Sequence, residues 1–374
     1  MTATKTPRTW VSLQYVRGLA ALLVVGFHVS EQMENRLGQS FLGGALRFGW
    51  CGLDLFFVLS GFIMAWIHGG EVGVPERLGA YLRKRAQRIY PLYWSLLLPA
   101  TLVAFLIPQF ATDRERSIDV LIRSWLLLPI RGLPLLGVAW TLCHEVFFYL
   151  MFGLLIALPR AGRWGVWTVW LTGTLIAGAT VNAGRWPLES DSTLPPLWLA
   201  FLFNPLNLEF VAGCALGGWL RRPGEGAKSL SIELPARPWG LLLLLPALGI
   251  LATWARLQSA LLTALPPSLA RAVVVGGAGL WVLAVLLRWE ASRDARRSMP
   301  IFLAPLAAIG NASYSIYLVH YPLLVVAGVV LKKMDRQGAV PSLVTGFGLI
   351  ALVVLAGVVW HHAVEKPILR WVRR

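Results

Sequence analysis

Apolar runs of about twenty residues recur along the whole chain, and this recurrence limits the possible folds more than any other feature. A helix of roughly 20 residues crosses the hydrocarbon core of a membrane, which is about 30 Å thick. Ten runs of suitable length are present, at residues 11–29, 49–68, 89–108, 140–158, 164–182, 197–220, 238–255, 268–288, 312–331 and 342–364. They predict an all-α, polytopic integral membrane protein with about ten transmembrane helices.

The composition supports this interpretation. Of 374 residues, 57% are hydrophobic, only 14% are charged and 18 are tryptophan, which excludes a soluble domain of this size. The first run carries two ionisable side chains and has no small-residue cleavage site, so we expect it to remain as the first span. We therefore expect a single transmembrane domain over residues 1–374, without an additional soluble domain.

The positions of Lys and Arg predict the orientation of the chain. If the N-terminus lies inside, the inner segments carry 21 of these residues and the outer loops carry 11, in agreement with the positive-inside rule. Both termini are thus predicted to be cytoplasmic. The net charge of +16 follows from this asymmetry and from attraction to anionic lipid. We therefore expect the lipid bilayer, and no nucleic acid, as a partner.

The long segment 109–139 and the three cysteines complete the structural expectations. The stretch SIDVLIRSWLLLPI within that segment predicts an amphipathic helix at the membrane interface. Cys51, Cys143 and Cys214 lie in or beside spans and have neither zinc-site nor CxxC spacing. We expect them to be small core residues; a Cys51–Cys143 disulfide near the outer face is the alternative.

Arg17 and His28 lie in the first apolar run, eleven residues apart. Because a helix has about 3.6 residues per turn, the two side chains share one face and are separated by roughly 16 Å along the axis. An ionisable residue inside a membrane costs about 2.5–3.5 kcal/mol and usually marks a site or a pathway inside the bundle. A snorkelling arginine and a hydrogen-bonded structural histidine are the alternative.

Two carboxylates are expected at the depth of His28. Counted from the outer ends of their spans, Asp54 and Glu145 each lie about five residues inside. A histidine that is oriented by a buried carboxylate is the usual general base for deprotonating a hydroxyl. Capping or pairing within the bundle is the alternative for Asp54, and a structural role is the alternative for Glu145.

A basic cluster, Arg83, Lys84, Arg85 and Arg88, precedes the third span near Tyr90. Arg85 and Arg88 are three residues apart and share a helix face. Arginine can bind phosphate through two parallel hydrogen bonds, and an aromatic ring can stack on adenine, so the cluster favours a nucleotide-phosphate site. The alternative is a positive-inside signal that touches anionic lipid.

Six segments together resemble the membrane-bound acyltransferase family 3. They are RGLAALLVVGFH, GLDLFFVLSGF, LRKRAQRIYPLYW, WTLCHEVFFYL, NASYSIYLVHYPLL and HHAVEKPILRW, in this order along the chain. Arg17 and His28 match the family pattern of an arginine and a histidine separated by ten residues, and Arg85 and Arg88 match its Arg-x-x-Arg pattern. The FFYL ending of the fourth segment is most similar to the O-acetyltransferases of exopolysaccharide and O-antigen.

The resemblance implies an O-acyltransferase in a bacterial inner membrane. It would take an acyl group, most simply acetyl, from acyl-CoA on the cytoplasmic side and transfer it to a hydroxyl of a surface glycan or a lipid-linked sugar. We assign His28 as general base, Glu145 or Asp54 as the carboxylate that orients it, and Arg17 to donor positioning. The expected donor-binding residues are Arg83, Lys84, Arg85, Arg88 and Tyr90. The thioester of acetyl-CoA is already activated, so no metal or redox cofactor is expected.

The resemblance also implies a set of cavity-lining residues: Ser60, Trp140, His144, Tyr149, Tyr314, Tyr317 and His320. Tyr314, Tyr317 and His320 recur every three residues and form a polar stripe on one helix; interfacial aromatics and a structural histidine are the alternative. Ser60 would be the nucleophile of an acyl-enzyme route, with helix packing as the alternative. His144 stands where related branches have a different residue.

Charged residues near the C-terminus are expected to be structural. Glu365, Lys366 and Arg370 predict an ion-pair network at the inner end of the last span. His361 and His362 have no metal-site spacing with other ligands.

A proton-coupled transporter or flippase is the main alternative function, because intramembrane Arg, His, Asp and Glu also suit transport. Against it, the two halves of the sequence show no inverted repeat, and the basic cluster has no transport role. A non-catalytic scaffold is disfavoured because it needs no buried ionisable residues. Neither the acceptor sugar nor the oligomeric state is predicted.

Overall fold

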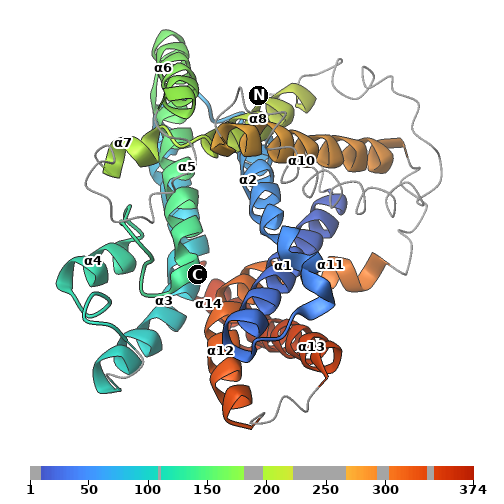
Figure 1. Ribbon diagram of the computed structural model, residues 1–374. Coiled ribbons are helices and arrows are strands. Elements are labelled where there is room, and N and C mark those ends of the chain that lie inside the picture. Colours follow the sequence, from blue (N-terminus) through green and yellow to red (C-terminus); the bar gives the residue numbers. More distant parts are fainter. Residues whose placement is uncertain (1–9, 108–110, 181–196, 222–266, 293–302, 335–340) are drawn as a thin grey trace.

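The computed structural model describes residues 10–107, 111–180, 197–221, 267–292, 303–334 and 341–374. Within these residues every regular element is a helix (Figure 1). The longer helices are α1 (Ser12–Gln32), α2 (Gly52–His68), α3 (Leu78–Leu106), α5 (Trp140–Ala157), α6 (Arg160–Thr180), α8 (Asn207–Leu220), α10 (Pro267–Ser292), α12 (Ser313–Met334) and α13 (Ser342–Trp360). The shorter ones are α4 (Ile118–Leu126), α7 (Leu197–Leu202), α11 (Ala304–Asn311) and α14 (Lys366–Val372). Single-turn or irregular helical segments at Met33–Leu37, Phe41–Cys51, Pro75–Arg77, Gly137–Ala139 and His361–Glu365 adjoin them.

Eight stretches of the described residues are long and apolar enough to cross a membrane. They are Ser12–Leu37, Phe41–His68, Pro75–Leu106, Gly137–Ala157, Leu197–Leu220, Leu269–Ala291, Ser313–Lys333 and Ser342–Val372. The predicted span 164–182 forms α6, which is not among them because Thr, Gly and Trp interrupt its aliphatic residues. The predicted span 238–255 lies outside the described residues. The chain is therefore a multi-pass, all-helical membrane protein, and the count of ten spans stays a prediction.

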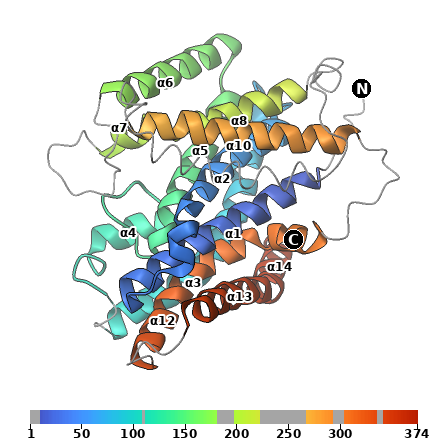
Figure 2. The same ribbon diagram turned by 45° about the vertical axis from the view of Figure 1, so that its right-hand side comes forward.

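Helix α1 lies at the centre of the bundle, in contact with α2, α11, α12 and α13 (Figures 1 and 2). Glycines permit its close approach to α11: a Cβ at Gly18 would collide with the carbonyl of Leu306, and one at Gly310 with the carbonyl of Gln14. Small residues at such crossings let helix backbones touch inside membranes. The central place of α1 brings its two ionisable residues, Arg17 and His28, among the other helices.

A second glycine crossing joins α2 to α8. A Cβ at Gly61 would collide with the carbonyl of Phe210, and one at Gly213 with the carbonyl of Val58. The two backbones therefore touch directly. This contact decides the rotation of α2, because the face with Val58 and Gly61 must point at α8 and the opposite face must point elsewhere.

The stretch expected to form an interfacial helix is α4, which begins after Ser117, whose side chain accepts a hydrogen bond from the Val120 N–H. Ile118, Ile122 and Leu126 are exposed and spaced four residues apart, so they form one apolar stripe that points away from the protein. This is the arrangement that an amphipathic helix at a membrane surface requires.

All three cysteines are buried and free. They are small core residues, as expected, and the alternative of a Cys51–Cys143 disulfide is wrong.

Candidate active site

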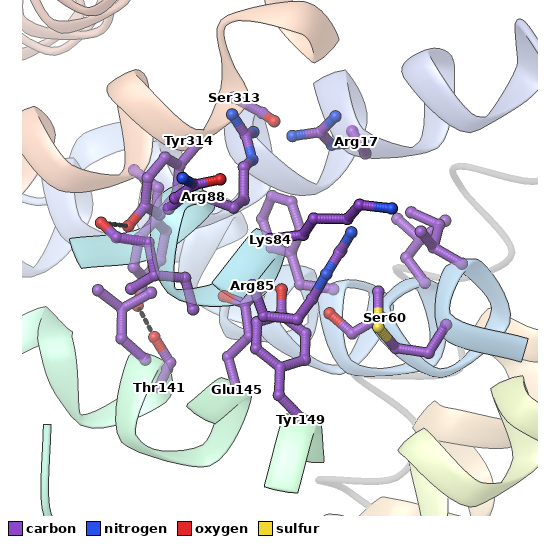
Figure 3. A pocket seen from close by; sticks show the side chains of 18 of the residues that line it. Arg17, Ser60, Lys84, Arg85, Arg88, Thr141, Glu145, Tyr149, Ser313 and Tyr314 are labelled. Atoms are coloured by element: carbon purple, nitrogen blue, oxygen red, sulfur yellow. Dashed lines mark hydrogen bonds between the residues drawn. The ribbon is translucent and has the colours of Figure 1, made fainter. Parts of the chain in front are cut away.

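A cavity of about 680 Å³ lies between α1, α2, α3, α5, α12 and the C-terminal end of the chain (Figure 3). Seven positively charged side chains line it: Arg17, Arg83, Lys84, Arg85, Arg88, Arg373 and Arg374. Among the described residues that line the cavity, Glu145 is the one acidic side chain. Because positive charge far exceeds negative charge on its walls, the cavity is suited to an anionic ligand.

The cavity has a charged open end and a neutral closed end. Arg83, Lys84 and the last two arginines are exposed, whereas Thr141 and Tyr317 are only 6% and 7% exposed. A ligand with a charged head and a neutral arm would therefore enter with the arm first.

One face of α2 forms a wall of the cavity. Leu53, Phe56 and Ser60 follow one another at helical spacing and all line it. Ser60 comes from α2 towards the space occupied by Arg85 and Glu145 (Figure 3). The predicted position of Ser60 in the cavity wall is therefore what the structure shows, while its chemical role stays a prediction.

Glu145 and Tyr149 lie one turn apart on α5, on the wall that faces the basic cluster. The Tyr149 hydroxyl donates a hydrogen bond to Glu145 Oε1 at 2.5 Å. Arg85 lies over the Tyr149 ring, with its guanidinium carbon 5.6 Å from the ring centroid (Figure 3). A phosphate that binds to Arg85 would therefore lie next to the hydrogen-bonded side chains of Tyr149 and Glu145.

Arg88 also lines the cavity, but it is already paired. Its Nη1 atom lies 2.6 Å from Glu365 Oε1, and its guanidinium carbon lies 5.1 Å from the Tyr314 ring centroid. Glu365 is 1% exposed and also contacts the Ser315 hydroxyl and His361 Nδ1. The expected network with the neighbouring charged residues is therefore wrong for Glu365: its cation comes from α3, because the last helical segment packs against that helix.

Tyr317 and Thr141 close the inner end of the cavity. The Tyr317 hydroxyl lies 2.6 Å from Thr141 Oγ1 and donates to the carbonyl of Val138 at 2.9 Å. The Tyr317 ring packs between Phe56, at 6.2 Å, and His320, at 5.3 Å. This hydrogen-bonded wall separates the cavity from the histidines behind it.

His28 lies behind this wall and not among the lining residues. Its ring is 5.1 Å from that of His320 and 5.2 Å from that of Tyr321. Its Nδ1 atom lies 3.0 Å from Glu31 Oε2, and the two side chains are 16% and 41% exposed. The carboxylate that contacts His28 is therefore Glu31, one turn further along α1. Sequence reasoning missed Glu31, although the three-residue spacing on one helix was a readable signal.

Asp54 does not contact His28 and is absent from the cavity lining. Both its oxygens pair with Arg271 of α10, at 3.0 and 2.9 Å, and Arg271 lies over the Trp50 ring at 4.3 Å. The buried carboxyl of Glu209 is nearby on α8. The prediction that Asp54 orients His28 is wrong in this structure, because Asp54 projects from the side of α2 that faces α8 and α10.

Three further predicted site residues lie away from the cavity. His144 is stacked on Phe201, with ring centroids 3.9 Å apart, and Trp140 packs edge-on against His144. The Tyr90 hydroxyl donates to the carbonyl of Leu126 at 3.0 Å. Each projects from a helix whose other side lines the cavity. The expectation that Trp140 and His144 line the cavity is wrong for this reason, and the donor-binding role expected of Tyr90 stays a prediction.

His320 accompanies His28 on the far side of the wall. It is fully buried, and its Nδ1 atom lies 2.5 Å from the carbonyl oxygen of Tyr317. The stripe predicted on α12 is therefore divided: Tyr314 and Tyr317 line the cavity, and His320 lies beside His28. The described residues hold no group of three or more His, Cys, Asp and Glu side chains with the geometry of a metal site.

Comparison with protein families identifies the chain. The model of an acyltransferase domain matches residues 10–361. The chain belongs to acyltransferase family 3. The matched residues include most of the cavity lining: Arg17, the basic cluster, Thr141 and Tyr317. Arg373 and Arg374, which also line the cavity, lie beyond the end of the matched residues.

Two curated relatives of this acyltransferase extend over nearly the whole chain. The acyltransferase MdmB of Streptomyces mycarofaciens is 26% identical over 97% of this chain and 92% of its own length. The exopolysaccharide production protein ExoZ of Rhizobium meliloti strain 1021 is 29% identical over 92% of this chain and 94% of its own length. No solved structure matches.

Proposed function

We propose that this acyltransferase moves an acyl group, most simply acetyl, from acyl-CoA to a sugar hydroxyl of an exopolysaccharide or another cell-surface glycan in a bacterial inner membrane. The observation that carries the proposal is a cavity that is cationic at its open end and ends at a hydroxyl-lined wall, with a histidine–carboxylate pair behind it. The named exopolysaccharide role of one relative supports the glycan acceptor. Residues 1–374 would form one transmembrane domain with both termini cytoplasmic.

The donor would enter through the charged end. The phosphates of CoA match the basic cluster. Arg85 is the best-placed cation in it, because it is half-buried over the Tyr149 ring inside the cavity and no described carboxylate pairs with it. The neutral pantetheine arm would extend along Ser60 and Tyr314 towards Tyr317. The thioester carbonyl would then lie at the closed end of the cavity.

His28 would act as the general base on the acceptor side. If Nδ1–H donates to Glu31, Nε2 is left to take the proton of the sugar hydroxyl, and the carboxylate stabilises the resulting imidazolium. The hydroxyl oxygen then bonds to the thioester carbon, the C–S bond breaks, and the proton passes from His28 to the departing CoA thiolate. An ester and free CoA are the products.

Tyr317 and Thr141 would supply hydrogen bonds where the donor and the acceptor meet. Both residues line the cavity, and the Tyr317 ring packs against His320, whose ring is 5.1 Å from that of His28. Their hydroxyls would therefore be hydrogen-bond donors close to the charge that develops on the carbonyl oxygen. For transfer to occur, their hydrogen bonds to each other and to the Val138 carbonyl must give way to hydrogen bonds with the substrate. Direct transfer would therefore need only these two hydroxyls and the histidine–carboxylate pair behind them.

The test is transfer by the purified full-length protein in lipid nanodiscs. Acetyl-CoA labelled in the acetyl group is supplied with a lipid-linked or oligosaccharide acceptor, and both free thiol and labelled ester are measured. We expect stoichiometric release of thiol and formation of ester only when acceptor is present. Binding of CoA without any ester formation on a panel of glycans would contradict the sugar acceptor, and absence of CoA binding would contradict the donor.

A further inference from the structure

The last two residues of the chain line the same cavity as the basic cluster. Arg373 and Arg374 follow α14 and lie at the exposed end of the cavity, together with Arg83 and Lys84. They come from beyond residues 10–361, the part that matches the family model. Neither was expected to take part in donor binding.

Two contacts hold the end of the chain against α3. Gln87 Nε2 donates a hydrogen bond to the carbonyl of Val372 at 3.0 Å, and seven residues earlier Glu365 pairs with Arg88 at 2.6 Å. The segment between these contacts is helical. Arg373 and Arg374 are therefore placed at the cavity by a fixed anchor on the same helix that carries the basic cluster.

No described side-chain carboxylate pairs with the two arginines at the open end. Among the described residues, Arg88 is the cavity cation with a carboxylate partner within 4.0 Å, and no such pair is found for Arg373 or Arg374. Several uncompensated cations around one opening repel each other until an anion binds. An arginine pair is well suited to a phosphate monoester, which offers several oxygens to its parallel N–H donors.

The order of chemical groups along CoA indicates which of its phosphates would lie near Arg373 and Arg374. The thioester must reach the closed end near Tyr317, so the part of CoA furthest from the thioester, the phosphorylated ribose of the adenosine, stays at the open end. The pyrophosphate, which is nearer to the pantetheine arm, falls at Arg85. We infer that Arg373 and Arg374 bind the 3′-phosphate of the donor and make the enzyme select CoA over 3′-dephospho-CoA. This inference rests on the proposed acyl-CoA donor.

The experiment measures the affinity of CoA and of 3′-dephospho-CoA for the full-length protein in nanodiscs of zwitterionic lipid. The variants are wild type, the double variant R373Q/R374Q, the charge-retaining R373K/R374K, and R370Q as matched control, since Arg370 is an exposed arginine of α14 that does not line the cavity. We expect wild type and R370Q to favour CoA by about ten- to a hundredfold. R373Q/R374Q should bind both ligands with the affinity that wild type has for dephospho-CoA, and the lysine variant should retain part of the preference.

The outcomes separate this inference from the proposed function. If wild type binds CoA and R373Q/R374Q keeps the full preference, the inference is wrong and the donor assignment stands. If wild type binds neither ligand, the proposed function itself fails. Repeating the measurement in nanodiscs with anionic lipid distinguishes a lipid phosphate: if the double variant loses only its response to anionic lipid and keeps its CoA preference, the arginines bind headgroups and the inference is overturned. Equal melting temperatures of R370Q and R373Q/R374Q control for folding.

Discussion

Two buried arginine–carboxylate pairs join distant parts of this chain, Arg88 with Glu365 and Arg271 with Asp54. They have the same exposures, 28% for each arginine and 1% for each carboxylate. Their surroundings differ: Arg88 borders the cavity beside other cations, whereas Arg271 is packed over Trp50 beside Glu209. Charge and burial alone therefore do not distinguish a functional from a structural residue. The two pairs are distinguished by their surroundings: one borders the cavity and the other is packed within the bundle.

The largest effect on turnover is expected at His28, which pairs with Glu31 behind the wall of the cavity that Arg88 borders. His28→Ala should lower the rate of acyl transfer by about 10²–10⁴-fold, because the proton acceptor is lost, while CoA binding and folding are retained. Glu31→Gln should lower it less, since it removes only the orienting charge. The measurement is ester formed per CoA-binding molecule. Near-normal turnover of His28→Ala on that basis would move the chemistry to another base.

The largest effect on stability is expected in the pair away from the cavity. Arg271→Gln leaves Asp54 and Glu209 buried without their cation and should lower the free energy of unfolding by about 3–5 kcal/mol. Turnover per folded molecule should stay near wild type. Unfolding in mixed micelles and a donor titration provide the two measurements.

The matched control for this variant is an exposed pair. Arg47 contacts Glu34, and the two side chains are 45% and 46% exposed, so Arg47→Gln should cost no more than about 1 kcal/mol. If Arg271→Gln lost acyl transfer at wild-type stability, Arg271, Asp54 and Glu209 would belong to the active site. The two arginine–carboxylate pairs would then not differ in function.

A smaller effect is expected on donor binding, and it should differ between Arg85 and Arg88 of the basic cluster. Arg85→Gln should weaken CoA binding by about 1.5–3 kcal/mol through lost charged hydrogen bonds, with stability unchanged because no described carboxylate depends on it. Arg88→Gln should weaken binding and also destabilise the protein, because Glu365 loses its partner. Calorimetric CoA titrations and melting curves of both variants are compared. Unchanged CoA affinity in both would reduce the cluster to an orientation signal.

The smallest effect is expected at Ser60. It lines the cavity, but the described histidines nearest the proposed reaction lie behind Tyr317, so no described histidine is placed to activate it. Under direct transfer, Ser60→Ala should remain within about threefold of the wild-type rate. Mass spectrometry of protein quenched during turnover tests the alternative. An acetyl group on Ser60, together with an inactive alanine variant, would establish the acyl-enzyme route.

Much of the fold and part of the candidate site could be predicted from the sequence. The apolar runs sufficed for an all-helical, multi-pass protein, because the cost of burying a backbone in lipid leaves few other solutions. The basic cluster, Glu145, Tyr149, Tyr314 and Tyr317 all line one cavity. Their approximate level along each span could be predicted, because that level follows from counting residues from the end of the span.

Which way each side chain points was decided by tertiary structure. Asp54 was expected at the depth of His28, but the glycine crossing of α2 and α8 turns it away from His28 and towards Arg271, 217 residues along the chain. Glu365 meets Arg88 across 277 residues, and the chain end reaches the cavity through Gln87. Such pairings depend on how helices rotate and cross when their backbones touch. Local periodicity identifies the faces of one helix, as it does for Ser60 with Leu53 or His28 with Glu31, whereas the neighbour that each face meets is chosen only when all the helices pack together.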